Sequence, residues 1–275
     1  MNALWLIPAL LLYALAAAGF ILDRIGSRGR LAEAATWMLA AGAATQTVYL
    51  AAAAIQIGNV PVINFAQSLC FLAWLTALAA LGLIVRYRMS VVGAIVTPII
   101  FLAIAVAATM SHIGRIVMPQ SLRSAWLPIH VTLAFLGYAL FVLAAGVSAV
   151  YLVFERRLKA KRPFDTSDDH APSLEKLDRI NYHLLGWGFL MLSLAITSGA
   201  IWADATWGHF WSWEPQESWS LAIWLLYAAL LESRLTVGWR GRRAAALTIV
   251  VFTVLVGSFI SVNLVTPGKH GGSFG

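Results

Sequence analysis

The sequence predicts an all-α fold, a polytopic helical bundle that crosses a membrane about eight times. Hydrophobic residues make up 60% of the 275 residues and charged residues only 11%, which is too apolar for a soluble domain. The apolar residues are gathered into eight runs, each near the roughly 20 residues that a helix needs to span a bilayer. Helices satisfy the polar groups of the backbone internally within lipid, and a helical bundle follows from these observations.

The first predicted span is the apolar run 2–22. No charged segment precedes this run and no convincing cleavage site follows it, which favours a membrane span over a removed signal peptide. The remaining spans are predicted at 34–56, 66–85, 91–110, 130–153, 184–203, 218–236 and 244–265. Connections are short except for 111–129 and 154–183, so the whole chain, 1–275, is expected to form a single domain.

Basic residues are distributed unevenly over the loops between these spans. Sixteen of the 19 Lys and Arg residues lie in alternate loops that would share one side of the membrane. Because Lys and Arg are retained in cytoplasmic loops, both termini are predicted to lie outside. The charged stretch 154–183 then becomes a cytoplasmic linker, whereas the loop 111–129 and the C-terminal tail lie on the outer face. Topology explains the net charge of +7, and no nucleic-acid partner is predicted.

Tryptophan is concentrated in the outer segment 202–224, which contains the stretch "WGHFWSWEPQES". Six of the 12 tryptophans of the chain lie in this segment. An interfacial belt is one interpretation, because indoles are common at the surfaces of a lipid bilayer. A belt would distribute its tryptophans over many helix ends, so their concentration favours a binding site. Glu214 and Glu217 lie within the segment, either as part of this site or as solvated loop charges.

Two histidines are predicted on the same outer face. His130 begins the fifth span and His270 follows the eighth, 140 residues later. Two neutral imidazoles would occupy both axial positions of a haem iron, and indoles can stack on the macrocycle. The alternative for each histidine is a hydrogen-bonded interfacial residue. Cys70 is the single cysteine, so the chain has neither an intrachain disulfide nor a C-x-x-C-H motif for covalent haem attachment.

Residues 177–247 follow closely the pattern around the tryptophan-rich WGxxWxWD motif, the WWD motif, of a known family. Shorter similarities lie in "GNVPVINFAQSLCFLAW", "SAWLPIH" and "VNLVTPGKHGGSFG". On these motifs the chain resembles the cytochrome c assembly family, which handles haem, and specifically its CcsA-type, or ResC-type, members of the system II pathway. The core region of resemblance is 58–275.

The resemblance implies a protein of the bacterial inner membrane that acts in cytochrome c biogenesis. Such a protein would bind haem b at the outer face and present it to the C-x-x-C-H motif of apocytochrome c, together with a CcsB-type, or ResB-type, membrane partner. It would be a subunit of a cytochrome c haem lyase complex, without an assigned catalytic residue. His130 and His270 match the family's axial ligands to haem iron. The tryptophan motif is matched by Trp207, Trp211, Trp213, Glu214, Pro215 and Glu217.

Three positions depart from the family pattern. Glu214 replaces the usual Asp of the tryptophan motif, and Gln67 replaces the Glu of the family's "NxxES". Glu232, in "LESR", stands where the family has a histidine near the cytoplasmic end of the seventh span, so stable haem is predicted only at the outer site. The secondary histidine candidates are His183 at the inner boundary and His209 and His112 outside.

Three other functions share part of this pattern. A CcmC-type haem exporter would have about six spans and lacks the C-terminal "PGKH". A HemX-like membrane factor of haem metabolism is compatible with the missing histidine of "LESR". A transporter that uses tryptophan only as a membrane anchor is the third alternative.

Overall fold

The computed structural model describes residues 3–26, 30–110, 124, 126–161 and 172–262. All regular secondary structure in these residues is helical, which confirms the predicted all-α fold. A short 3-10 helix, η1 (Ala3–Leu6), leads into eight α-helices. These are α1 (Ile7–Gly26), α2 (Arg30–Ile57), α3 (Phe65–Tyr87), α4 (Ser90–Met110), α5 (Trp126–Lys159), α6 (Leu174–Trp207), α7 (Pro215–Leu235) and α8 (Arg242–Ile260).

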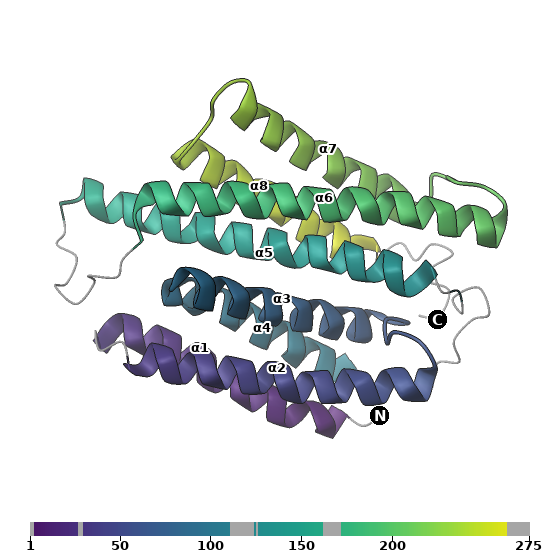
Figure 1. Ribbon diagram of the computed structural model, residues 1–275, viewed down its shortest axis with the longest axis horizontal. Helices are drawn as coiled ribbons and strands as arrows, with labels where there is room; N and C mark the ends of the chain where they lie inside the picture. The colour runs from purple at the N-terminus through teal and green to yellow at the C-terminus, as the bar shows by residue number, and fades with distance from the viewer. Residues whose placement is uncertain (1–2, 27–29, 111–123, 125, 162–171, 263–275) are drawn as a thin grey trace.

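Seven helices in the described residues are long and apolar enough to cross a membrane, so the chain is a multi-pass membrane protein. Only α7 does not meet the hydropathy requirement, although its 21 residues have sufficient length. It carries Glu217, Glu232 and Arg234 together with several serines, and these polar residues lower its mean hydropathy. α7 nevertheless contacts both α6 and α8 in the bundle (Figure 1).

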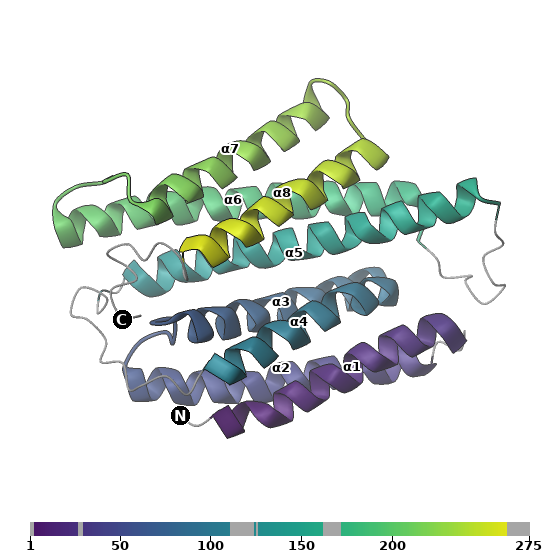
Figure 2. The ribbon, with the colours of Figure 1, turned by 180° about the vertical axis from the view of Figure 1, so that it is seen from behind.

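Consecutive helices run antiparallel, in three layers (Figures 1 and 2). α1 and α2 form one layer, α3 and α4 the next, and α5 and α6 the third, with α7 and α8 packed against the third. The connections α1–α2, α3–α4, α5–α6 and α7–α8 share one end, here named the basic end because it carries Arg86, Arg156 and Arg242. The opposite end is named the tryptophan end, because it carries the segment 202–214, which comprises the last turns of α6 and the α6–α7 loop.

α5 and α6 share the most extensive interface of the bundle. A Cβ atom at Gly137 of α5 would lie 3.1 Å from the carbonyl oxygen of Gly188 and 3.2 Å from the backbone nitrogen of Leu192, both in α6. Small residues permit such close backbone approach in membrane proteins, where dispersion contacts hold helices together. The α5–α6 pair is therefore the closely packed part of the molecule on which α7 and α8 rest.

α5 and α6 extend beyond the predicted spans 130–153 and 184–203. Each has 34 residues, which is about 50 Å of helix, whereas the hydrocarbon core is about 30 Å thick. At the end of α5, Lys159 Nζ donates to Glu155 Oε1 at 2.7 Å, and at the start of α6 the Ser173 side chain accepts from the N–H of Lys176. Local charge pairs and caps thus extend both helices into the stretch 154–183. Part of the predicted linker is therefore helical.

A buried ion pair fixes the basic end of α7 to α6. Arg234, only 7% exposed, donates to Asp178 Oδ2 at 2.8 Å and to Asn181 Oδ1 at 3.2 Å. Asp178 Oδ1 also accepts from the backbone N–H of Gly241, in the α7–α8 connection, at 2.9 Å. The arginine of "LESR" therefore has a structural partner, whereas the Glu232 side chain of the same motif is exposed.

Candidate functional site

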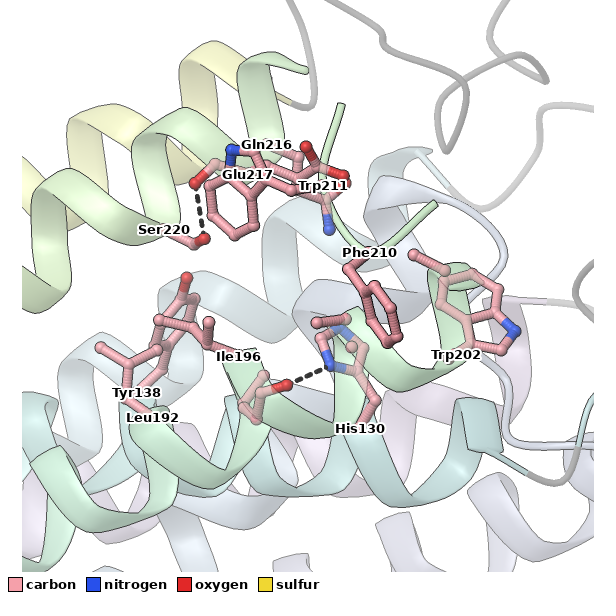
Figure 3. Close-up of a pocket in the computed structure, with 15 residues that line it drawn as sticks. His130, Tyr138, Leu192, Ile196, Trp202, Phe210, Trp211, Gln216, Glu217 and Ser220 are labelled. Carbon is pink, nitrogen blue, oxygen red and sulfur yellow. Dashed lines mark hydrogen bonds between the residues drawn. The ribbon is translucent and has the colours of Figure 1, made fainter. Parts of the chain in front are cut away.

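A cavity of about 110 Å³ lies at the tryptophan end, where α5, α6 and the start of α7 meet the α6–α7 loop. α5 contributes His130 and Tyr138, the loop contributes Phe210 and Trp211, and α7 contributes Ser220 among others (Figure 3). The Ser220 hydroxyl donates to the backbone carbonyl oxygen of Glu217 at 2.7 Å, and the hydroxyl end of Tyr138 lies below it in this view (Figure 3). The lining thus combines an imidazole, aromatic rings and a few hydroxyl groups.

Small residues make up much of the α6 wall of the cavity. Ala195, Gly199 and Ala203 recur at every fourth position, so they lie on one face of the helix. Ala134 of α5 adds a further small side chain. Larger side chains on this face would fill the cavity. The space beside His130 therefore exists because small residues recur on this face of α6.

The backbone of α6 selects the tautomer of the His130 ring. The ring is half-buried, and its Nδ1 atom lies 2.8 Å from the carbonyl oxygen of Ala195 (Figure 3). A carbonyl oxygen only accepts hydrogen bonds, so Nδ1 carries the proton and donates it. In a neutral imidazole, Nε2 then holds the lone pair that binds a metal ion. This arrangement sets both the tautomer and the orientation of the ring.

Two residues of α6 hold the His130 ring in place. A Cβ atom at Gly199 would lie only 2.7 Å from both Nδ1 and Cε1 of the ring, so the absence of a side chain at Gly199 is what lets the ring reach the helix. Trp202, 1% exposed, stacks near the ring with centroids 6.2 Å apart and an interplanar angle of 25°. The imidazole therefore lies on a rigid element with little freedom to rotate.

Glu217 organises the α6–α7 loop. Gly208 caps the C-terminal end of α6 in the left-handed conformation, with a φ of 77° that glycine adopts readily. The Glu217 carboxylate accepts from the backbone N–H of Ser212 at 2.7 Å and of Glu214 at 3.3 Å, and also from the Ser212 hydroxyl. Glu214 is the N-cap of α7, Pro215 is its first residue, and Glu214 and Glu217 together form a capping box. The two acidic residues of the motif therefore define where α7 begins.

The indoles of the motif occupy different positions around the cavity. Trp211 lines it, and its buried Nε1 atom has no hydrogen-bond partner in the described part of the chain. Trp213 is 71% exposed and adopts a φ of 58°, in the left-handed region that residues with side chains rarely occupy. The Trp211 and Trp213 rings meet edge to face with centroids 5.8 Å apart, and Trp207 packs in the same way on Trp202 at 5.1 Å. The loop thus presents one indole to the cavity and one to the outside.

The α2–α3 connection reaches the same end of the bundle. Ile63 packs in a small buried cluster with Leu127 and Trp202. Gln67 of the "NFAQS" stretch accepts from the backbone N–H of Ile63 at 2.9 Å, and Asn64 caps α3 by accepting from the N–H of Gln67. Gln67 thus accepts the hydrogen bond from Ile63 through an uncharged amide oxygen.

The structure brings part of the predicted site together. His130, Trp211 and Glu217 line the cavity, and Trp207 reaches its wall through Trp202. Trp213, Glu214 and Pro215 belong to the adjoining loop and cap but do not line it. His270 and His112 lie outside the described residues. His183 is exposed on α6, and His209 does not line the cavity, although its Nδ1 atom is buried without a hydrogen-bond partner in the described residues.

Several residues of the cavity were not predicted. Gly199, the Ala195 carbonyl group, Tyr138 and Ser220 have no place in the tryptophan motif. Two patterns in the sequence could have indicated them. Tyr138 follows His130 by eight residues and so lies on the same helical face. The small residues spaced by four in α6 are typical of close helix contacts.

The bundle and the cavity define a multi-pass helical membrane protein whose site joins an oriented imidazole to a loop rich in indoles. Sequence relationships then identify the family. The family described as "Cytochrome C assembly protein" matches residues 62–270, which is most of the chain. The chain therefore belongs to the cytochrome c assembly family, as the tryptophan motif predicted.

Individual relatives point to the CcsA type. "Cytochrome c biogenesis protein CcsA" of Prochlorococcus marinus (strain NATL2A) is 34% identical over 242 residues, which cover 78% of this chain and 77% of the relative. The protein of the same name from Synechococcus sp. (strain CC9902) is 35% identical over 240 residues, 78% of each chain. These relatives confirm the predicted CcsA type and a role in cytochrome c biogenesis.

A solved structure shares the fold. The "Cytochrome c Heme Lyase CcmF" superimposes with a TM-score of 0.64 and 20% sequence identity. The match covers 100% of this chain and 49% of that protein, so the chain spans about half its length.

Proposed function

We propose that this chain binds haem b at the tryptophan end of the bundle and presents it for covalent attachment to apocytochrome c. The observation that carries the proposal is the 2.8 Å hydrogen bond from His130 Nδ1 to the Ala195 carbonyl oxygen, beside the cavity. It makes Nε2 the lone-pair nitrogen of the ring, and ligating histidines in metal sites are commonly held through their other nitrogen in this way. Membership of the cytochrome c assembly family supports haem as the source of the metal.

The described residues fit one face of a haem. The cavity of about 110 Å³ is too small to enclose a porphyrin, because pockets that enclose drug-sized ligands measure about 300–1,000 Å³. Haem would therefore lie at the mouth, with its iron next to His130 and an edge accessible to another protein. Phe210, 59% exposed, and Trp211 offer apolar rings for the macrocycle at this mouth.

His270 is the proposed second axial ligand. α8 ends at Ile260 at the tryptophan end of the bundle, so the chain that leads to His270 leaves from the side on which His130 lies (Figure 1). Two imidazoles would complete the coordination of the iron. In this proposal His130 is the ligand on a rigid helix and His270 the ligand on the C-terminal segment.

The protein contributes position, and haem supplies the reactive vinyl groups. Each thiol of the C-x-x-C-H motif adds across one vinyl group: the sulfur bonds to one carbon and the thiol hydrogen goes to the other, so electrons are neither gained nor lost. The histidine of the substrate then replaces one imidazole of this chain, which weakens the hold on the product. Positioning alone lowers barriers of this kind by several kcal/mol without an acid or base from the protein.

The proposed setting is the bacterial inner membrane, with the tryptophan end outside. The connections that share the basic end carry most of the 19 Lys and Arg residues, and such residues are retained in the cytoplasm. A CcsB-type membrane protein is the proposed partner in a haem lyase complex.

The absorption spectrum of the purified protein, with and without its partner, tests the proposal. The wild-type protein is expected to show six-coordinate haem, and His130→Gly is expected to lose it, with partial recovery when free imidazole occupies the vacated position. His183→Gly is the matched control, because His183 is exposed on α6 and lies outside the cavity lining. Wild-type haem content in His130→Gly would show that His130 is not a ligand.

A further inference from the structure

We infer that Ser198 is a positioning residue that weakens the bond of His130 to haem iron; the inference rests on the proposed function. The Ala195 carbonyl oxygen, which accepts from His130 Nδ1 at 2.8 Å, also accepts from the Ser198 hydroxyl at 3.0 Å. Ser198 is buried in α6, directly before Gly199. The Nδ1–H of His130 therefore shares this acceptor with a second side chain.

The shared carbonyl group has more donors than lone pairs. In an α-helix the carbonyl oxygen of residue 195 also faces the N–H of residue 199, one turn later. A carbonyl oxygen has two lone pairs, so three donors compete for it. The Ser198 hydroxyl thereby makes this oxygen a weaker acceptor for the imidazole N–H.

The strength of that hydrogen bond sets the basicity of the ring. When Nδ1–H donates strongly, negative charge builds up on the imidazole and Nε2 becomes a stronger ligand, especially for ferric iron. Competition from Ser198 reduces this effect. Haem in this proposal is a substrate that has to leave, so a ligand of moderate strength holds it and still permits its transfer.

Serine often bonds back to its own helix without any function. Ser258 of α8 provides the comparison: it is also buried, and its hydroxyl donates to Leu255 O at 2.8 Å over the same three-residue spacing. Within the part of the chain that the structure describes, no histidine donates to the Leu255 carbonyl oxygen. Ser258→Ala is therefore a matched control for the loss of a buried hydroxyl group.

The experiment compares the haem-loaded wild-type protein with Ser198→Ala and Ser258→Ala. The first measurement is the midpoint potential of the bound haem. Ser198→Ala is expected to increase the preference for ferric over ferrous haem by up to about tenfold, which corresponds to a potential lower by up to about 59 mV. The second measurement is the rate at which ferric haem is lost to an excess of a haem-scavenging protein, which Ser198→Ala is expected to slow. Ser258→Ala is expected to match the wild type in both.

A Ser198→Ala protein with wild-type potential and wild-type haem loss would overturn the inference, and so would faster loss or failure to retain haem. These results are distinguishable from failure of the proposed function. If His130→Gly retains haem, or the wild-type protein binds none, both proposals fall together. If haem depends on His130 but does not respond to Ser198, only the role of Ser198 is refuted.

Discussion

Replacement of Gly199 by alanine would insert a methyl group between α6 and the His130 ring. The new Cβ atom would lie 2.7 Å from Nδ1 and from Cε1, whereas ordinary contact begins at 3.4 Å. Both atoms belong to the rigid ring, so a small rotation cannot relieve the contact. The ring has to move away from α6, by about 0.7 Å, to reach ordinary packing distances.

This displacement has a calculable effect on the hydrogen bond to Ala195. A shift of about 0.7 Å directly away lengthens the 2.8 Å distance to about 3.5 Å, the limit for a hydrogen bond. Loss of an orienting partner of this kind reduces metal affinity by about 10–100-fold. Overpacking costs about 1–3 kcal/mol, and about 0.5–1 kcal/mol of this is offset because alanine favours a helix over glycine. The fold should therefore survive while the site fails.

The assay is the ratio of haem to protein after purification, together with the thermal unfolding midpoint. Gly186→Ala is the matched control on the same helix, because nothing lies within 4 Å of a Cβ atom there. Gly199→Ala is expected to lose most of its haem with a small change in the unfolding midpoint, and Gly186→Ala is expected to keep its haem. If Gly199→Ala retains the haem content and spectrum of the wild type, the contact between this helix and His130 does not control the site.

Three further predictions concern charged residues. Glu217→Gln is expected to lower the thermal unfolding midpoint and haem content more than Glu214→Gln, because the Glu217 carboxylate accepts from the backbone N–H groups of both Ser212 and Glu214; equal losses would refute this. Arg234→Leu is expected to destabilise the protein by about 3–5 kcal/mol by leaving Asp178 without its cation, and the added change Asp178→Asn should recover part of this in denaturant unfolding. Glu232→Ala is expected to leave the haem content unchanged at no more than one haem per chain, because this side chain is exposed and a carboxylate is a poor ligand for ferrous iron. A pyridine haemochrome assay measures the haem content. Two haems per wild-type chain, one of them lost in Glu232→Ala, would contradict this prediction.

The fold was predictable because lipid imposes a strong constraint on the chain. Apolar runs of sufficient length have to be helices, so the existence of the elements followed from composition alone. The ends of the helices could not be predicted from composition, because hydropathy marks the lipid boundary and not the end of the helix. α6 begins at Leu174, ten residues before the predicted span at 184, because Ser173 caps it and charged residues continue it in water.

The lining of the candidate site was predictable only where side chains of an unusual type contribute to it. His130 and Trp211 were identified because imidazole and indole are rare and chemically distinctive. The acceptor for His130 is a backbone carbonyl group, which every residue possesses, so the identity of Ala195 gave no indication of it. Gly199 acts through the absence of a side chain, and its effect appears only once α5 lies against α6.

The acidic residues of the tryptophan motif are explained by the helix that follows them. α7 buries only Ile223, Tyr227, Leu230 and Arg234, and it is too polar to be held by lipid alone, so its start depends on local bonds. The left-handed backbone of Trp213 costs about 1–2 kcal/mol. Hydrogen bonds to a charged group contribute about 1.5–3 kcal/mol, so the Glu217 carboxylate is sufficient to offset this strain. Glu217 and Pro215 contribute much of what fixes the conformation of the loop and the start of α7. Glu214 can therefore replace the usual Asp at the N-cap without loss of the loop conformation.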